Sequence, residues 1–415
     1  MEAAKISSPP TSLDFSDPSV WEAGVPHETI AEIRRRDRVY WNPEADGRGF
    51  WAVLGFNDIV EVSKKPDVFS SAARNGGHRI FNENEVSLAN TNDDSIGTPF
   101  ISMDPPEHQN YRRLVVPALS QARMANMEAR IRARAQDLLD KLEPGRSVEW
   151  VDAVSGPFPL MTLVELLDVS ADDWKKLFRW TNFFVAEDDP DCRASPDEAA
   201  ALMQEFGDYV KWLHDTRRAN PGSDVVSMLA NTEVDGRPMS FGEFMGNMVL
   251  LTVGANETTR NSISHGICAF AANPDQWDHV RADPSVLSEG VREIVRYASP
   301  VMHMRRTAVV DTMIGSVPIR KGDKVLLWYI AGNRDETAIS SPNQFDIRRK
   351  NIKHVGFGTG QHVCVGQRLA ELQLRIMFGE LAKRFTGFEV VNPPRRLRSN
   401  FINGLKSLHV KPNVT

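Results

Sequence analysis

Residues 354–381 read HVGFGTGQHVCVGQRLAELQLRIMFGEL and place one cysteine, Cys364, between a glycine-rich turn and the start of an amphipathic helix. Glycines at four nearby positions let the backbone approach a flat or bulky group and turn amide N–H groups inward. A thiolate at a helix N-terminus is stabilised by the helix dipole. The pattern therefore indicates a nucleophilic or metal-ligating sulfur, against the ordinary alternative of a buried structural cysteine.

Two other chemistries remain possible for this segment. His354 and His362 lie close to Cys364 in the sequence, but the chain has no further Cys or His pair at the spacing of zinc ligands. A nucleophilic Cys–His enzyme would also need an oxyanion-binding element, and none is recognisable.

Composition limits the class of protein. The 415 residues are 41% hydrophobic and 25% charged, which is ordinary for a folded domain, and the net charge of −6 argues against a nucleic-acid-binding protein. The three cysteines are too few and too widely spaced for a disulfide framework. The N-terminal residues do not resemble a signal peptide, and no run of about 18 apolar residues predicts a membrane span. We therefore expect a cytoplasmic protein that does not insert into a membrane.

Hydrophobic periodicity predicts a helix-rich fold. Residues 123–272 are helical almost throughout, and the last of these helices covers 241–272 before Asn273-Pro274. Two strands flank the turn Asp46-Gly47, and further strands meet at the turn Lys321-Gly322. The predicted fold class is mainly α with small β-sheets, without repeats or long linkers.

Residues 357–366, FGTGQHVCVG, resemble the haem-binding signature of the cytochrome P450 superfamily. Its fixed positions are filled by Phe357, Gly358, Gly360, His362, Cys364 and Gly366. The resemblance implies a single P450 domain over residues 1–415 with haem b as cofactor. It makes Cys364 the axial ligand of the iron, with Phe357 and Gly358 against the cofactor.

A second match is VGANETTRNS, residues 253–262 of the long predicted helix. In the superfamily the corresponding small residues, here Gly254 and Ala255, leave room for dioxygen. Thr258 would pass a proton to it, with Glu257 relaying protons from solvent. A polar, exposed helix face is the alternative interpretation of this stretch, although the helix is apolar on both sides of it.

Two further matches concern the surroundings of the cofactor. His108 and Arg112 share one helix face, and the resemblance implies that they hold a haem propionate together with Arg306 and His362. The pair Glu293 and Arg296 corresponds to a structural lock of the superfamily. Its third member would be Arg349, with Arg348 as the alternative.

The resemblance implies a bacterial monooxygenase that uses O2. Since the chain is only long enough for one such domain, we expect electrons from NAD(P)H to arrive through an iron–sulfur ferredoxin and a ferredoxin reductase, with Arg113 on the docking face. A peroxide-dependent haem enzyme would typically lack the pair Glu257-Thr258. A non-catalytic haem sensor or electron carrier would have a packed oxygen pocket, against which Gly254 and Ala255 argue.

The substrate is expected to be small and hydrophobic or amphiphilic. The stretch that begins SPVMHMRRTA resembles the branches of the superfamily that hydroxylate alkyl chain ends, with Val301, Met302 and His303 lining the pocket. The stretch GANETTRNSISHG is similar to members that act on sterol side chains and branched lipids. This favours hydroxylation of an unactivated alkyl group. An alkyl chain, a terpenoid, a fatty acid or an alkyl-aryl compound would fit.

The loop SSAARNGGHRIFNENE, residues 70–85, departs from an apolar pocket wall. It carries Arg74, Asn75, His78 and Arg79 around two glycines, which predicts a site for a phosphate or carboxylate head group. The alternative is an exposed polar loop tip.

Overall fold

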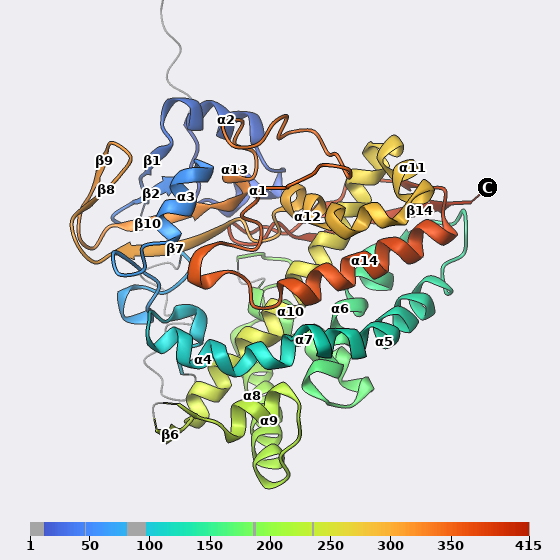
Figure 1. The fold of residues 1–415 in the computed structure, drawn as a ribbon, viewed down its shortest axis with the longest axis horizontal. Coiled ribbons are helices and arrows are strands. Elements are labelled where there is room, and N and C mark those ends of the chain that lie inside the picture. The colour runs from blue at the N-terminus through green and yellow to red at the C-terminus, as the bar shows by residue number, and fades with distance from the viewer. Residues whose placement is uncertain (1–11, 46, 81–96, 186–187, 235, 415) are drawn as a thin grey trace, which may run out of the picture.

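Helices form most of the molecule, and the strands gather in small sheets at its edges (Figure 1). The computed structural model describes residues 12–45, 47–80, 97–185, 188–234 and 236–414. The expected fold class, mainly α with small β-sheets, is confirmed. Within the described ranges, no helix combines the length and the hydrophobicity that crossing a bilayer requires.

The helices are α1 (Pro18–Glu22), α2 (His27–Arg36), α3 (Phe56–Ser63), α4 (Glu107–Val115), α5 (Gln121–Leu139), α6 (Pro157–Leu167), α7 (Trp174–Val185), α8 (Pro196–Ala219), α9 (Val225–Asn231), α10 (Phe241–Ala272), α11 (Pro274–Ala282), α12 (Leu287–Ala298), α13 (Tyr329–Gly332) and α14 (Gln367–Arg384). The strands are β1 (Val39–Asn42), β2 (Phe50–Val53), β3 (Phe69–Ser70), β4 (Val148–Glu149), β5 (Glu233–Val234), β6 (Arg237–Pro238), β7 (His303–Ala308), β8 (Thr312–Ile314), β9 (Val317–Ile319), β10 (Lys324–Trp328), β11 (Gly387–Val390), β12 (Arg395–Arg396), β13 (Leu405–Ser407) and β14 (His409–Asn413).

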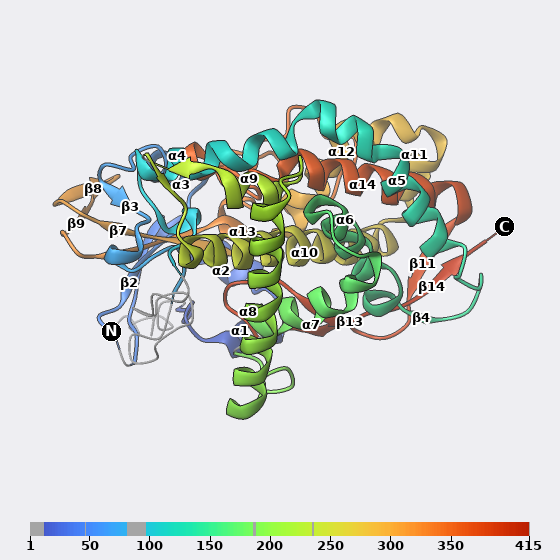
Figure 2. The same ribbon diagram turned by 90° about the horizontal axis from the view of Figure 1, so that it is seen from below.

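Helix α10 runs through the middle of the molecule, and its bounds equal the predicted 241–272 (Figure 2). The Ser240 side chain accepts a hydrogen bond from the Glu243 N–H, and the Glu243 carboxylate accepts one from the Ser240 N–H, so the helix starts with a capping box. At 1.5 Å per residue its 32 residues extend about 48 Å. Helices α6, α7, α8, α12 and α14 pack around it.

The largest sheet has the strand order β1-β2-β10-β7-β3. β10 is parallel to β2 and antiparallel to β7, and all five of its residues are buried. Val325 and Leu327 face one hydrophobic cluster, while Leu326 and Trp328 face another, so both faces of the sheet are covered. The predicted strands on either side of residues 46–47 are β1 and β2; Asp46 itself lies outside the described residues.

The C-terminal strands return to the middle of the chain. β12 pairs with β13, and the loop between them carries Phe401 and Ile402. Ile402 forms an isolated bridge with Val301, and the Met302 N–H donates to the Phe401 carbonyl at 2.9 Å. This loop therefore lies against the start of β7, about a hundred residues earlier in the sequence.

Candidate active site

The turn before α14 is held by its own backbone. The Cys364 N–H donates to the Phe357 carbonyl at 2.8 Å, and the Gly358 N–H donates to the Val355 carbonyl at 2.9 Å. Gly360 has a φ of +70°, and a Cβ there would lie 2.3 Å from the Ser63 carbonyl oxygen, so only glycine fits. The predicted glycine-rich turn thus has a steric cause, which is its close approach to α3.

The Cys364 side chain is accessible, although the surrounding protein desolvates its thiol. Burial raises the pKa of the thiol, while N–H groups of Gly366 and Gln367 and the charge of Arg112 oppose that shift. These groups stabilise the thiolate, the form in which sulfur binds a metal. Helix α14, which begins three residues after the cysteine, packs on α10.

One stripe of α10 is less buried than the rest of the helix. Gly254 is exposed, and Ala255 and Thr258 are half-buried, although most of their neighbours are buried. A Cβ on Gly254 would meet no atom within 4 Å. The Thr258 hydroxyl donates to the Gly254 carbonyl at 3.1 Å, which occupies an oxygen in the helical hydrogen-bond ladder. Gly254, Ala255 and the Thr258 hydroxyl, which were predicted to act together, thus lie on the same face of α10.

Glu257 points elsewhere. Its carboxylate is fully buried, pairs with Arg260 and accepts a hydrogen bond from Asn256 at 3.2 Å. Arg260 also donates to Asn182 of α7 at 2.9 Å. Burial raises the pKa of Glu257, and Arg260 opposes the shift. Because successive helix residues project about 100° apart, Glu257 faces α7 while Thr258 faces the less buried stripe.

Four cationic or hydrogen-bonding side chains predicted to hold a propionate lie close together. The rings of His108 and His362 are 4.1 Å apart, and Arg112 and Arg306 both act electrostatically on them. Burial, together with the charges of Arg112 and Arg306, lowers the pKa of His108 to about 4. The pKa of His362 is lowered for the same reasons. Both histidines are therefore neutral near pH 7 and have an N–H to donate.

These residues fit the carboxylates of a haem. Both ring nitrogens of His108 and Nε2 of His362 are buried and have no hydrogen-bond partner among the described residues. Unpartnered buried polar atoms are costly, and two guanidinium groups beside them favour an anion. The thiol of Cys364, the space at Gly254 and this cluster are together the arrangement that a haem requires.

The predicted lock is confirmed as a structural element. Glu293 and Arg296 form two hydrogen bonds of 2.7 Å in a fully buried pair, and Arg349 Nε lies 3.2 Å from the Glu293 carboxylate. Arg296 also donates to the carbonyls of Asn333, Pro342 and Gln344. Arg348, the alternative third member, is exposed.

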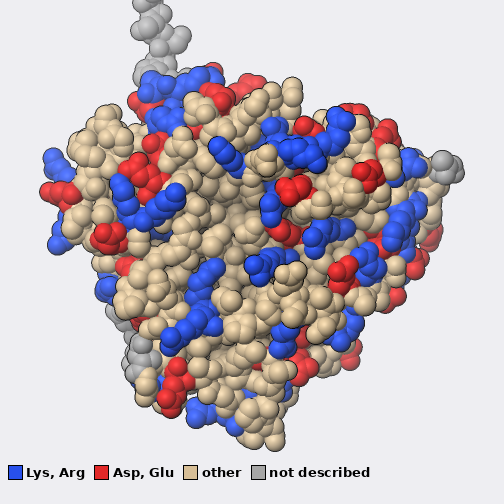
Figure 3. All heavy atoms as spheres, in the orientation of Figure 1, with Lys and Arg blue, Asp and Glu red and all other residues tan. Residues whose placement is uncertain are grey.

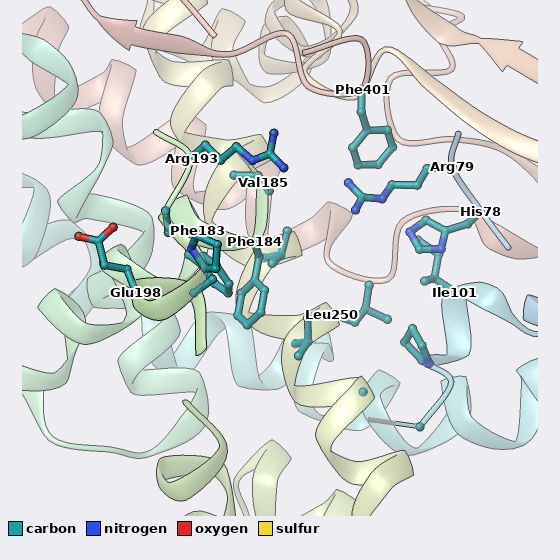
Figure 4. A pocket seen from close by; sticks show the side chains of 18 of the residues that line it. His78, Arg79, Ile101, Phe183, Phe184, Val185, Arg193, Glu198, Leu250 and Phe401 are labelled. Atoms are coloured by element: carbon teal, nitrogen blue, oxygen red, sulfur yellow. The ribbon is translucent and has the colours of Figure 1, made fainter. Parts of the chain in front are cut away.

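A cavity of about 830 Å³ adjoins the less buried stripe of α10 (Figure 4). Val249, Leu250 and Val253, which directly precede Gly254, form one wall. The size and the apolar lining suit a small hydrophobic ligand. Further apolar walls come from Ile101, Phe183, Phe184, Val185 and Phe401. Sequence patterns missed these residues because they belong to separate segments and have no characteristic spacing.

Only some residues of the loop predicted to bind a head group line the cavity. His78 and Arg79 line the cavity. Asn75 instead fixes the loop, because its carbonyl accepts a hydrogen bond from Thr307 at 2.6 Å and its side chain donates to Ser70 at 2.8 Å. Arg74 is exposed and does not line the described cavity. Residues 81–85 of the predicted loop lie outside the described residues.

The three residues expected at the start of β7 do not line the described cavity. Met302 is buried in a hydrophobic cluster with Trp21 and Trp328. His303 is fully buried, packs against the Trp328 ring in a tilted arrangement and donates from Nδ1 to the Asn400 carbonyl at 3.0 Å. Val301 is half-buried and bridges Ile402. The expectation fails for Met302 and His303 because the returning C-terminal loop covers them.

An ion-pair cluster, here called the clasp, joins the segment after α7 to the β12–β13 hairpin. Asp189 is fully buried, and Lys406 pairs with both Asp189 and Asp191 at 2.8 Å. Asp189 also accepts from the Arg398 N–H at 2.9 Å, and Arg395 pairs with Asp191. Burial raises the pKa of Asp189, but these hydrogen bonds outweigh it and leave the pKa lowered. The clasp holds together two walls of the cavity.

Comparison with known proteins agrees with this geometry. The cytochrome P450 family model matches residues 160–411. The chain is 53% identical to linalool 8-monooxygenase of Pseudomonas putida, over 96% of this chain and 98% of that protein. It is 35% identical to a steroid C26-monooxygenase of Rhodococcus jostii, over 97% of this chain and 85% of that protein.

Solved structures agree as well. A Mycobacterium marinum cytochrome P450 in complex with pseudoionone superposes with a TM-score of 0.87 at 32% identity, covering 98% of this chain and 100% of that one. A cytochrome P450 from Novosphingobium aromaticivorans gives 0.86 at 35% identity, covering 96% and 98%. The chain belongs to the cytochrome P450 family and is a monooxygenase with haem b as cofactor and electrons supplied by redox partners.

Proposed function

We propose that this protein hydroxylates a terminal, unactivated alkyl group of a branched, terpenoid-sized substrate. The observation that carries the proposal is the apolar cavity of about 830 Å³, whose α10 wall ends next to Gly254. A relative with 53% identity acts on linalool, and a structural relative binds pseudoionone; both compounds are acyclic and branched. A fatty acid or a steroid side chain is a less compact occupant of the same cavity.

Haem bound through Cys364 supplies the activation of dioxygen for insertion into a C–H bond. The chain's residues orient the cofactor and handle protons. We assign the hold on its carboxylates to the N–H groups of His108 and His362 and to the guanidinium groups of Arg112 and Arg306, and we place Phe357 and Gly358 against it. The cluster and the thiol then fix the position of the cofactor from two sides.

Proton delivery is assigned to Thr258. Its hydroxyl donates to the Gly254 carbonyl and could turn toward the exposed side of the stripe without disturbing the helix. Glu257, held by Arg260 and Asn256, would supply protons only after leaving that ion pair. Its raised pKa makes the protonated form easier to reach than in water.

We assign electron delivery to an iron–sulfur ferredoxin and its NAD(P)H-dependent reductase. Lys and Arg side chains gather over the middle of the face that α4 and α14 occupy (Figure 3). Arg113, Arg368 and Arg375 are exposed on these two helices, and Val116 is 47% exposed beside them. An acidic partner with an apolar centre would match this face. The three free cysteines fit the reducing cytoplasm, and we treat residues 1–415 as one catalytic domain.

The test is turnover of linalool by the haem-containing protein with a bacterial ferredoxin, its reductase, NADH and isotopically labelled dioxygen. The expected result is one labelled oxygen atom in a terminal hydroxymethyl product. Faster turnover with hydrogen peroxide and no redox partners would support a peroxide-dependent enzyme instead. Haem reduction without any product from linalool or other branched terpenoids would contradict the proposed substrate class.

A further inference from the structure

Residues 97–102, here called the crossing segment, cross α10 before they enter the cavity wall. The Gly97 N–H donates to the Gly242 carbonyl at 2.8 Å, and the Phe100 N–H donates to Asn247 Oδ1 at 3.1 Å. The Asn247 side chain is fully buried, and its Nδ2 donates to a carbonyl of the preceding turn at 2.8 Å. Two hydrogen bonds thus hold the crossing segment on the first two turns of α10.

The backbones of the crossing segment and α10 touch at a pair of glycines. A Cβ on Gly246 would lie 1.9 Å from the Gly97 carbonyl oxygen, and a Cβ on Gly97 would lie 2.6 Å from the Glu243 nitrogen. Because Cβ atoms do not come closer than about 3 Å to other heavy atoms, neither position accepts a side chain unless the segment moves. Both glycines also line the cavity, so their contact is part of the cavity boundary.

The crossing segment covers the same face of α10 that forms the cavity wall. Gly242 and Gly246 are four residues apart, and Val249, Leu250 and Val253 continue along that face at helical spacing. The wall that α10 gives to the cavity begins at Gly246, where the segment crosses, and ends at Val253, which adjoins the less buried stripe. The segment therefore blocks one end of this wall, and the stripe lies at the other.

We propose that the crossing segment closes the far end of the cavity and limits the length of the alkyl chain that the protein accepts. This inference rests on the proposed function and adds the length of the substrate to it. From Gly246 to Val253 the helical rise is about 10 Å, which is comparable to the length of an acyclic terpenoid. Pro99 and Ile101, which the segment carries into the cavity, complete the end wall. Val249 is the first lining side chain of α10 beyond the contact, so its size sets the room that remains.

A closed end converts the length of a chain into its position. Hydrophobic contacts are not directional, so an apolar chain slides along the wall until one end meets an obstacle. A chain that is too long must bend or leave, because a close contact between two backbones yields less than a flexible side chain does. A chain of fitting length places its other end beside the stripe that carries Gly254 and Thr258. This agrees with oxidation of a terminal alkyl group.

The experiment is a titration of the ferric, haem-containing protein with straight-chain alkanes from heptane to undecane, followed by the spin-state change in its absorption. Alkanes differ in length alone, and linalool is the reference ligand. Gly246→Ala and Asn247→Ala release the crossing segment, the first by a clash and the second by loss of a hydrogen bond. Val249→Ala and Val249→Phe change the room at the closed end. Gly207→Ala, which alters a helical glycine of α8 whose Cβ would lie 4.0 Å from Met245 Cε, is the matched control.

In the original protein, each added methylene should strengthen binding about threefold to fourfold until the chain meets the end wall. The next homologue should then bind about tenfold more weakly. In Gly246→Ala and Asn247→Ala this drop should shrink to about threefold or less, because the wall yields. Val249→Ala should move the tightest-binding alkane to a longer homologue, and Val249→Phe should move it to a shorter one. Gly207→Ala should keep the original profile.

Three results would overturn the inference. The first is an affinity that keeps rising across the whole series in the original protein, which would mean that the end is open. The second is a profile that keeps the same tightest-binding alkane and the same drop in all four variants. The third is an equal loss of affinity for every alkane in these variants, which would show a general change of shape. Original protein that responds neither to linalool nor to any alkane would contradict the proposed function itself, and with it this inference.

Discussion

The proposed haem-facing side of the site and the wall of the apolar cavity are built in different ways. On the side of Cys364, backbone hydrogen bonds and the close approach of Gly360 to Ser63 fix the turn, and the stripe is part of the continuous helix α10. The cavity wall combines side chains from the loop after β3, α7, the segment before α8, α10 and the C-terminal hairpin. Ion pairs of the clasp hold part of it together. The residues assigned to the chemistry are thus fixed by local geometry, whereas the cavity wall depends on side chains from separate segments.

The largest expected effect is on the lock behind the haem-facing side. In Glu293→Gln, Arg296 keeps a buried charge without a counter-ion, so the free energy of unfolding should fall by about 3–5 kcal/mol. Urea unfolding followed by circular dichroism measures this. Arg348→Gln, at an exposed position on the same segment, should change it by less than about 0.5 kcal/mol. Equal losses in the two variants would contradict the assignment of the lock.

The second effect concerns proton delivery from α10. Thr258→Ala removes the hydroxyl that donates to Gly254, and the yield of product per NADH consumed should fall about a hundredfold. Thr258→Ser retains the hydroxyl and should keep most of the yield. Product analysis gives the amount of hydroxylated product, and absorbance gives the amount of NADH consumed. A normal yield from the alanine variant would exclude Thr258 as the proton donor.

The third effect tests whether His303 belongs to the interior or to the cavity wall. Burial lowers its pKa to about 3, and its bond to Asn400 opposes the shift. The unfolded chain, with a histidine pKa of about 6.5, therefore binds the extra proton first as the pH falls. This one group should lower the free energy of unfolding by about 1.4 kcal/mol per pH unit between about pH 6 and pH 4.

His303→Asn should remove that part of the pH dependence and leave the affinity for linalool unchanged. Urea unfolding at several pH values and the spin-state titration measure the two properties separately. An unaltered slope together with weaker linalool binding would place His303 in the substrate site after all.

The smallest effect concerns the clasp. Asp189→Asn weakens the contact with Lys406, so the cavity walls should separate more often and linalool should enter and leave about threefold to tenfold faster. Stopped-flow absorption measures both rates. Asp215→Asn, which alters an exposed ion pair with Lys211, is the control. Identical rates in all three proteins would mean that the clasp does not limit access.

The same contrast explains what the sequence could predict. The pattern around Cys364, the stripe Gly254–Thr258 and the pair of Glu293 with Arg296 each depend on short spacings, which carry over directly into geometry. The resemblance to the family added Arg349 to that pair. The direction of Glu257 could not be predicted, because Arg260 and α7 determine it. Arg193 and Phe401 were missed because only the tertiary fold brings them to the cavity. Met302 and His303 were misplaced because a loop a hundred residues later covers them.

Absorption of the reduced, carbon-monoxide-bound protein tests most directly whether Cys364 holds the haem. We expect the strongly red-shifted band of thiolate-bound haem in the original protein. In Cys364→His, haem should be retained by the propionate-binding cluster, and the band should move to the position of histidine-bound haem. A histidine-type band in the original protein, or an unchanged thiolate-type band in the variant, would contradict the assignment of Cys364 as the axial ligand.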